Sequence, residues 1–134
     1  MKKNFFWISR ILSILLILFF LFFLVTGVWI GFGVKDNCRT AQEKYGENCV
    51  NSLVLLLDND DEDFRSRNSA IWALGQLGDE KSLSVLEKYY TGDIPDREPL
   101  DQGISQYELK KAINLTGGGF NITAIVWRWL FKIS

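Results

Sequence analysis

The first third of the chain is apolar without interruption. Residues 11–34 are 24 residues without a charged side chain, and their only hydroxyl side chains are Ser13 and Thr26. A helix of roughly 20 apolar residues is long enough to cross the hydrocarbon core of a bilayer. A helix in a soluble core would carry a polar stripe, which this segment lacks. The pattern therefore predicts a transmembrane anchor over residues 1–34, with residues 11–34 in contact with membrane lipid.

An uncleaved anchor fits this segment better than the alternative, a cleaved signal peptide. Basic residues precede the apolar run, as in both classes. The run exceeds the roughly 7–15 apolar residues of a signal-peptide core, and no Ala-x-Ala cleavage site follows it. Gly27 and Gly31 form a Gly-x-x-x-Gly pair at its far end. This spacing leaves pairing with another membrane helix as a further hypothesis.

After the span, apolar residues recur at the spacing of amphipathic helices. Asp36 and Asn37 are expected to cap a short helix over 38–45, which Gly46 ends. Four further helices are predicted, around residues 50–57, 62–77, 79–90 and 105–115, with Asn48, Asp79 and Ser105 as N-caps, Ser105 and Glu108 as a capping box, and Gly78 as a stop. A loop with both prolines of the chain precedes the last one.

The apolar positions of the helix at 50–57 recur 33 residues later in the helix at 79–90. Repeats of this length are typical of helical solenoids, in which each helix pair buries its face against the next pair. The predicted fold class is therefore all-α, an N-terminal transmembrane helix followed by a short α-solenoid. The predicted units are residues 1–34, a repeat domain over 35–118 and an apolar tail over 119–134.

The stretch VNSLVLLLDNDDEDFRSRNSAIWALGQLGDEKSLSVLEKY resembles the HEAT repeat, in the short bacterial and archaeal form named after phycobilisome lyases. In that pattern an apolar helix ends at an acidic turn, an Arg opens the second helix, and Leu-Gly-Asp closes it. The matching positions are Arg67, Ala70, Ala73, Leu74, Gly75, Leu77, Gly78 and Asp79. The second helix pair matches by helix spacing alone, because it lacks the Leu-Gly-Asp ending.

This resemblance implies an armadillo-like helical domain that works as a protein-interaction or scaffold module, without catalysis of its own. Related repeats occur in bilin lyases, so an enzyme accessory or lyase-like protein is the alternative. More loosely, the whole chain resembles the small membrane-anchored HEAT-repeat proteins of prokaryotes. The partner is an unknown protein, and Trp72, Trp127 and Trp129 are the candidate contact residues.

The composition of the chain argues against a catalytic or metal-binding site. The chain has no histidine, which removes the commonest general base and metal ligand. The acidic run DNDDED begins like a calcium-binding loop, but Asp63 stands where that loop needs Gly, and Ser69 where it needs Glu. No catalytic, cofactor or metal site, and no small-molecule substrate, is predicted.

The distribution of charge bears on the partner class and on the orientation of the chain in the membrane. All 16 acidic residues but only 12 of the 15 basic ones follow Val34, a net charge of −4 that argues against nucleic acid as a partner. Basic residues flank both ends of the span almost equally. We expect the N-terminus in the cytoplasm, since long domains translocate regardless of charge. The prediction is a single-pass protein of the cell (inner) membrane with an extracytoplasmic repeat domain.

Cys38 and Cys49 both follow the span, and an extracytoplasmic pair predicts a disulfide. On one continuous helix about 16 Å of rise would separate them, so the bond requires a turn, which Tyr45-Gly46 supplies. Two buried free thiols are the alternative.

The tail is the least explained segment. It holds Trp127 and Trp129 among other large apolar residues, beside Arg128 and Lys132. It is too short to span a bilayer. Three interpretations stay open: it caps the solenoid, it lies in the membrane interface, or it binds a partner. In each case residues 120–132 are expected to be ordered against apolar surface, because large apolar side chains left in water cost roughly 1.5–3 kcal/mol each.

Overall fold

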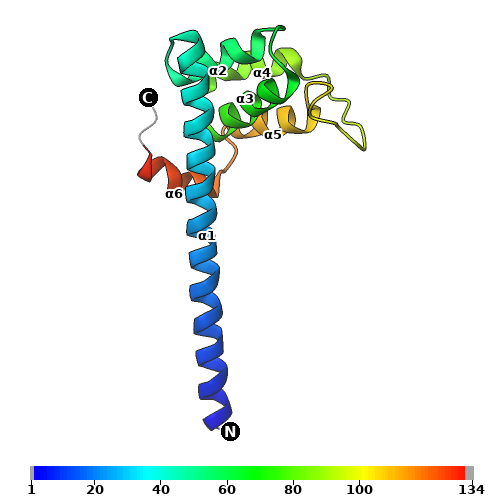
Figure 1. Cartoon of the computed structure of the whole chain (residues 1–134). Coiled ribbons are helices and arrows are strands. Elements are labelled where there is room, and N and C mark those ends of the chain that lie inside the picture. The colour runs from blue at the N-terminus through cyan, green and yellow to red at the C-terminus, as the bar shows by residue number, and fades with distance from the viewer. Residues whose placement is uncertain (1, 132–134) are drawn as a thin grey trace.

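The structure, a computed structural model, describes residues 2–131, and all regular structure within that range is helical. The prediction of an all-α chain with one long apolar N-terminal helix is confirmed. That helix, α1 (Lys2–Tyr45), is 44 residues long and is long and apolar enough to cross a membrane. Its first half projects alone as a rod, and its second half carries the remaining helices (Figure 1).

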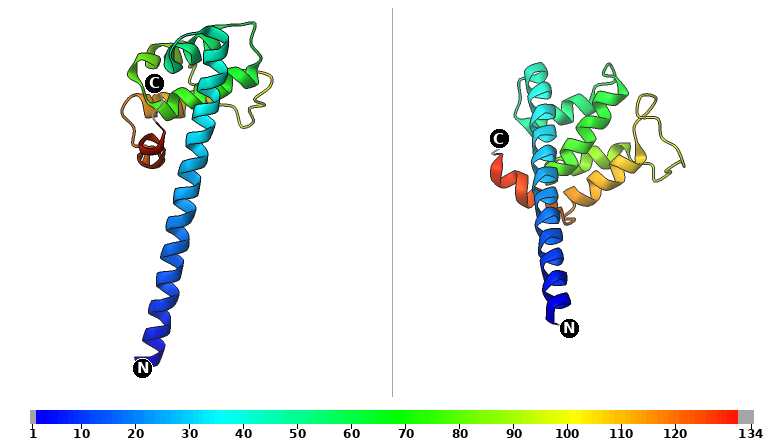
Figure 2. Two further views of the ribbon diagram at one scale, coloured as in Figure 1. Left: turned by 60° about the vertical axis from the view of Figure 1, so that its left-hand side comes forward. Right: turned by 60° about the horizontal axis from the view of Figure 1, so that its bottom comes forward.

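The other elements are α2 (Cys49–Asp58), α3 (Phe64–Leu77), the short 3₁₀ helix η1 (Glu80–Ser82), α4 (Leu83–Tyr89), α5 (Gln106–Thr116) and α6 (Ile122–Leu130). Helices α2 and α3 pack against each other and against α1, and α5 packs against α3 and α4. Helix α6 folds back and lies across α1 just below this group (Figure 2). The layers therefore run from α1 through α2 and α3 to α4 and α5.

The predicted helix ends are formed by the expected residues. The side chains of Asn48 and Ser105 accept backbone N–H bonds inside the first turns of α2 and α5, and Asp79 does the same for η1. Gly78 closes α3 with a φ of +64°, in the left-handed region that glycine adopts without strain. The capping box at α5 is only half formed, because Glu108 pairs with Lys111 instead of reaching back to Ser105.

The separate helix expected over residues 38–45 is absent. Those residues are the last turns of α1, and residue 34 lies inside that helix. Asn37 does not cap anything: its amide donates to the carbonyl of Gly33 one turn earlier. Neither proline nor a left-handed residue interrupts this stretch, so the helix already formed in the span continues at little cost.

The second half of α1 supplies one wall of the hydrophobic core. Val34, Cys38 and Ala41 lie one helical turn apart on the same face and are almost fully buried. Opposite them, and between the following helices, lie Leu53, Leu56, Leu57, Ala70, Ile71, Ala73, Leu74, Leu86, Leu109 and Ala112. The helix that resembles a membrane anchor is thus also a core helix of the domain.

Small residues set how closely the helices approach. A Cβ atom built on Gly75 of α3 would lie 2.7 Å from the Cα of Ala112 on α5. One built on Gly33 would lie 3.0 Å from the ring of Trp72. Glycine at these positions lets α3 and α5 touch through their backbones and leaves room on α1 for the Trp72 ring.

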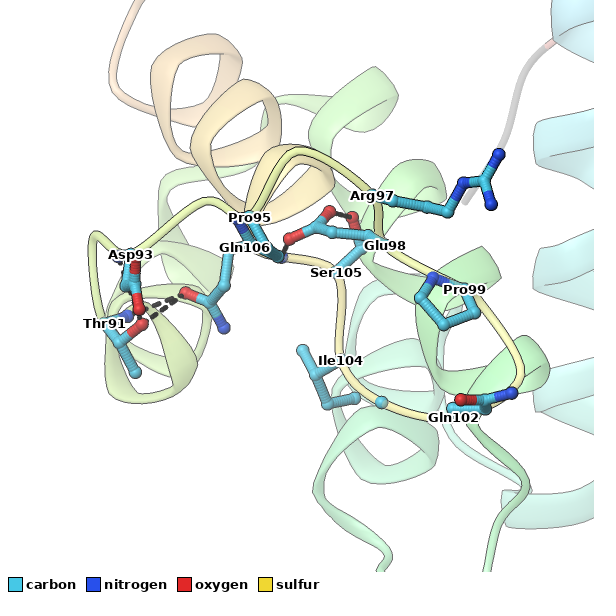
Figure 3. A pocket seen from close by; sticks show the side chains of 11 residues that line it. Thr91, Asp93, Pro95, Arg97, Glu98, Pro99, Gln102, Ile104, Ser105 and Gln106 are labelled. Carbon is cyan, nitrogen blue, oxygen red and sulfur yellow. Dashed lines mark hydrogen bonds between the residues drawn. The ribbon is translucent and has the colours of Figure 1, made fainter.

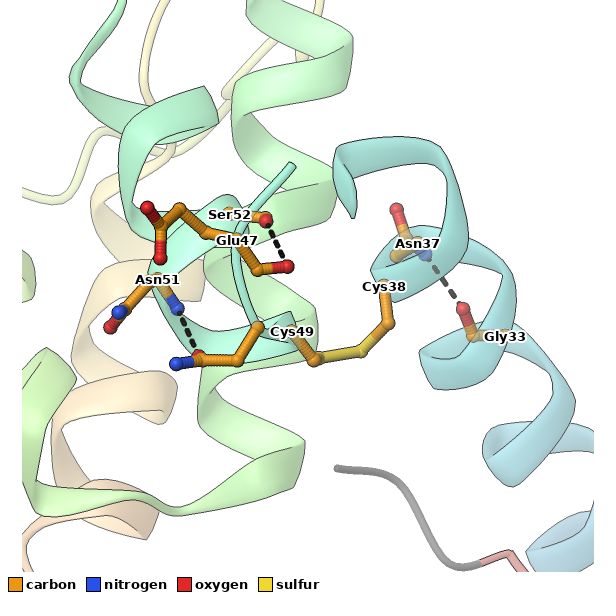
Figure 4. Close-up of a disulfide and its surroundings, with 8 residues drawn as sticks. Gly33, Asn37, Cys38, Glu47, Cys49, Asn51 and Ser52 are labelled. Carbon is orange, nitrogen blue, oxygen red and sulfur yellow. Dashed lines mark hydrogen bonds between the residues drawn. A yellow bond between two sulfur atoms is a disulfide. The ribbon is translucent and has the colours of Figure 1, made fainter. Parts of the chain in front are cut away.

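Cys38 and Cys49 form a disulfide, and their Cα atoms are 4.9 Å apart (Figure 4). The bond ties α1 to the first residue of α2 across the turn at Gly46, whose φ is +73°. The predicted pairing and the predicted turn are both confirmed. The disulfide therefore closes the corner at which the chain leaves the long helix.

Replacing Gly75 tests the close approach of α3 and α5. We expect Gly75→Ala to lower the free energy of unfolding by about 1–3 kcal/mol, the usual cost of overpacking, although alanine favours a helix interior by about 1 kcal/mol. Gly103→Ala is the matched control, since no atom lies within 4 Å of a Cβ built there. Denaturant titration of the full chain in detergent measures both variants. Equal stability of the two would contradict the packing argument.

Removing the disulfide tests how much the bond between α1 and α2 contributes to stability. The double variant Cys38→Ala, Cys49→Ala is expected to lose about 2–4 kcal/mol of stability, because the unfolded chain is no longer restrained. The wild-type chain treated with a reductant should lose a similar amount. Non-reducing mass spectrometry of the membrane-extracted protein should find the two residues linked, and alkylation of both thiols without reduction would show that they are not.

Candidate interaction surface

Arg67, the first residue of the repeat-like motif, joins three elements. Its Nε donates to the carbonyl of Leu57 at the end of α2 at 2.9 Å, and its Nη1 pairs with Asp60 at 2.9 Å. The guanidinium also lies over the ring of Tyr89 at 5.5 Å from the ring centre. The side chain is almost fully buried. Arg67 therefore fixes the acidic turn and α4 relative to α2, which is a structural role.

The other motif residues also serve packing. Ala70, Ala73 and Leu74 are fully buried, and Leu77 packs at the edge of the core. Gly75, Gly78 and Asp79 provide the close contact, the helix stop and the N-cap described above. None of these side chains presents a reactive group to solvent.

The acidic run DNDDED binds the chain's own basic and hydroxyl groups. Asp58 accepts hydrogen bonds from Lys88 Nζ and the Tyr89 hydroxyl, both at 2.6 Å. These bonds, that from Lys88 above all, lower the pKa of the Asp58 carboxyl. Glu62 in turn pairs with Lys44 and accepts from the Tyr45 hydroxyl at 2.6 Å, and its pKa is lowered by the same kind of contact.

These pairs connect the acidic turn to α1 on one side and to α4 on the other. Among residues 2–131, no cluster of three or more acidic or cysteine side chains is arranged to hold a metal ion. The run is therefore a junction between helices.

The loop between α4 and α5 spans residues 90–105 and is held in one conformation. Asn68, buried inside α3, donates from its Nδ2 to the carbonyls of Leu100 at 3.0 Å and Gly103 at 2.8 Å. Its Oδ1 accepts from the backbone N–H of Ser105 at 2.8 Å. One side chain thus satisfies three backbone groups of a loop that has no helix of its own.

Glu98 anchors the middle of the same loop to the start of α5 (Figure 3). Its carboxylate accepts from the Ser105 hydroxyl at 2.6 Å and from the backbone N–H groups of Gln106 at 2.8 Å and Tyr107 at 3.2 Å. Burial opposes ionisation of the group, but these donors outweigh it, so the pKa of Glu98 is lowered. The negative charge also sits at a helix N-terminus, where the helix dipole favours it.

The anchored loop presents apolar and charged side chains together. Leu100 in the loop and Tyr107 in the adjoining first turn of α5 are about half exposed, and Arg97 is exposed. One shallow depression is lined by Arg97 and the two prolines of the loop, and a second one is lined by Leu100 and Tyr107. The loop lies on the opposite side of the domain from α6 (Figure 1 and Figure 2). An ordered loop with exposed apolar residues is suited to contact with another protein.

The three candidate tryptophans are in different environments. Trp72 is half-buried against α1, and Trp127 is 1% exposed, so neither offers its ring to a partner in this structure. Trp129 is 83% exposed. The expectation that the tail is ordered is confirmed for α6, whereas Lys132 lies outside the described residues.

Gly27 and Gly31 are occupied by the chain's own tail. A Cβ on Gly27 would lie 2.8 Å from Val126, and one on Gly31 would lie 2.6 Å from Phe131 and 2.7 Å from Trp127. The Gly-x-x-x-Gly pair therefore receives α6 within the same chain. The hypothesis that this face pairs with another membrane helix is wrong for this structure, since the groove is filled.

Sequence reasoning missed Asn68 and Glu98. Asn68 follows Arg67 and begins the apolar pattern of α3, and a polar residue on that stripe is a signal for a buried hydrogen-bonding role. Glu98 lies between the two prolines in a loop, where acidic residues are ordinarily solvated. Its partners come from α5, so no local pattern identifies it.

Comparison of the chain with known protein families, with curated proteins and with solved structures finds no match. The resemblance to the HEAT repeat rests on the residues of the motif alone.

Replacing Glu98 tests the anchoring of the loop. We expect Glu98→Gln to speed amide hydrogen exchange at residues 105–107, measured at neutral pH, because the amide accepts at one oxygen and carries no charge. Glu108→Gln is the matched control. Glu108 lies in the first turn of α5, next to these amides, and its side chain bonds only Lys111.

The pH dependence has a defined sign. The folded-state pKa of Glu98 lies below the usual value near 4.3. Its stabilising effect is therefore present above about pH 4.3 and is lost as the pH falls through the lowered value. The stability difference between wild type and Glu98→Gln should shrink over that range. A difference that persists at lower pH would contradict this role.

Proposed function

We propose that the protein is a single-pass membrane protein whose helical domain is a protein-interaction or scaffold module without catalysis of its own. In this proposal α2 with α3 and α4 with α5 are two HEAT-like units. The observation that supports it best is the shared helix: α1 is bare over residues 6–22 and uncharged over 11–34, and from Val34 onward one of its faces is buried in the core. A domain built on its own anchor has a defined orientation relative to the membrane, as a scaffold requires.

The disulfide supports an extracytoplasmic domain in the cell (inner) membrane. Disulfides persist in oxidising compartments and are rare in the cytosol. With residues 35–131 outside, the short basic N-terminus remains in the cytoplasm, as expected if the long domain is translocated regardless of its charge. A reporter fused after Ser134 would read out this topology.

The loop at 90–105 is the surface that we assign to the protein partner. It is the longest segment without helix among the described residues, and insertions between the helices of a solenoid commonly carry its binding face. Asn68 and Glu98 hold it in advance, so binding does not have to order it. Leu100 and Tyr107 supply the apolar contact, and Arg97 supplies a charge at its edge.

Photo-crosslinking in native membranes tests this surface. A photoreactive phenylalanine analogue in place of Tyr107 should give a discrete crosslinked product with a second protein. The same analogue in place of Lys81, which is exposed on η1 away from the loop, is the control and should give none. The double variant Leu100→Ser, Arg97→Ala should weaken the product at Tyr107 without changing the stability of the chain. Equal crosslinking at both positions, or none at Tyr107, would contradict the assignment.

A further inference from the structure

Helix α6 carries an apolar face that nothing in the chain covers. Ile122, Ile125 and Trp129 are spaced at i, i+3 and i+7, so they lie on one side of the helix. Trp129 is 83% and Ile125 65% exposed. Phe120, just before the helix, and Leu130 at its end add further exposed apolar surface. Scattered apolar residues need no explanation, but a continuous stripe of this kind marks a contact surface.

The flank of α6 next to this stripe is hydrogen-bonded to the end of α3. Arg128 donates to the carbonyls of Gln76 at 2.8 Å and Leu77 at 2.5 Å, the last carbonyl groups of α3. Asn121 donates to the side chain of Gln76 at 2.9 Å. These bonds set the rotation of α6 about its own axis. The apolar stripe is therefore held in one direction and cannot turn inward.

Contacts with α1 show which direction that is. Val126 lies over Gly27, while Trp127 and Phe131 lie over Gly31, which is one turn nearer the domain. Ile122 and Trp129 are one turn from Val126 on the surface of α6. The exposed stripe thus continues from the Val126 side, toward the bare half of α1 and away from the domain.

The height of α6 along α1 matches the edge of a bilayer. From Trp7, exposed near the start of the bare segment, to Trp29, exposed beside the α6 contact, the helix rises by about 33 Å. A bilayer has a hydrocarbon core of about 30 Å, and tryptophan collects at both of its edges. Arg10, near the lower edge, lies with its guanidinium 4.3 Å from the ring centre of Phe6, the direction expected of a side chain that reaches for the nearer surface.

We propose that α6 is an interfacial helix: its stripe of Ile122, Ile125 and Trp129 is embedded in the headgroup–acyl boundary of the leaflet on the domain side. This inference rests on the proposed membrane anchor and adds a second, in-plane contact to it. The occupant of the stripe is lipid, because the stripe is continuous with the apolar surface of the span. The two contacts together fix the tilt and the height of the domain.

Depth-resolved quenching of the full chain in lipid vesicles tests the proposal. The native cysteines are paired, so single thiols from Ile125→Cys and Trp129→Cys can be labelled selectively with an environment-sensitive fluorophore. Tyr107→Cys is the aqueous control, and Leu16→Cys in the bare span is the buried control. The vesicles are phosphatidylcholine with phosphatidylglycerol, containing lipid that is spin-labelled either near the headgroup or near the chain end. Thermal melting in detergent checks that each variant keeps its fold, as expected for exposed positions.

We expect labels at 125 and 129 to show blue-shifted emission and to be quenched most by the lipid labelled near the headgroup. The label at 16 should be quenched most by the lipid labelled near the chain end, and the label at 107 by neither. Labels at 125 and 129 that behave like the label at 107 would overturn the proposal.

Labels at 125 and 129 that are shielded from water but not quenched by either lipid would also overturn it, because a protein or a second copy would then cover the stripe. If the label at 16 were not quenched, the proposed membrane anchor would be contradicted, and the proposal for α6 with it. Failure at 125 and 129 alone leaves the anchor and the proposed function standing.

Discussion

The packing of the second half of α1 against α2 and α3 is the contact on which the other helices depend. Val34, Cys38 and Ala41 complete a core that the short helices of the domain cannot enclose alone. The Cys38–Cys49 bond reinforces this contact at the corner where the chain turns back. Because a single uninterrupted helix serves both the apolar rod and the core, the rod and the domain move together.

Close backbone approach then determines where the remaining helices lie. Gly75 lets α5 touch α3, and Gly27 and Gly31 let α6 lie across α1. Each of these contacts replaces side-chain surface with backbone surface, so small shifts in helix position would open gaps or create clashes. Hydrogen bonds from two side chains complete the arrangement. Arg128 joins α6 to the end of α3, and Asn68, near the start of α3, joins the long loop to that helix. Helix α3 is consequently the hub to which both the loop and the tail are attached.

The two faces with exposed apolar residues therefore have fixed and different directions. One is formed by Leu100 of the loop and Tyr107 at the start of α5, and the other is the stripe on α6 that carries Trp129. In the proposed setting the first faces a protein partner and the second faces the membrane. A module held at a set height and tilt would present its loop in a constant geometry, which lowers the entropic cost of an encounter with another membrane-bound protein.

Local patterns in the sequence determined the apolar rod, the approximate bounds of α2, α3, α4 and α5, the caps at Asn48, Asp79 and Ser105, and the stop at Gly78. These features depend on residues within a turn or two of each other, so periodicity and capping rules suffice to predict them. The disulfide was also predicted, because both cysteines follow the span and a turn at Tyr45-Gly46 lets them meet. The unbroken course of α1 through residues 38–45, the filling of Gly27 and Gly31 by α6, and the anchoring of the loop by Asn68 and Glu98 were decided by tertiary contacts. Tertiary contacts also decided that Trp127 is buried and Trp129 exposed, although the two residues are only two positions apart on the same helix. Each of these outcomes depends on partners tens of residues away, and the spacing of neighbouring residues carries no information about which distant surface will meet them.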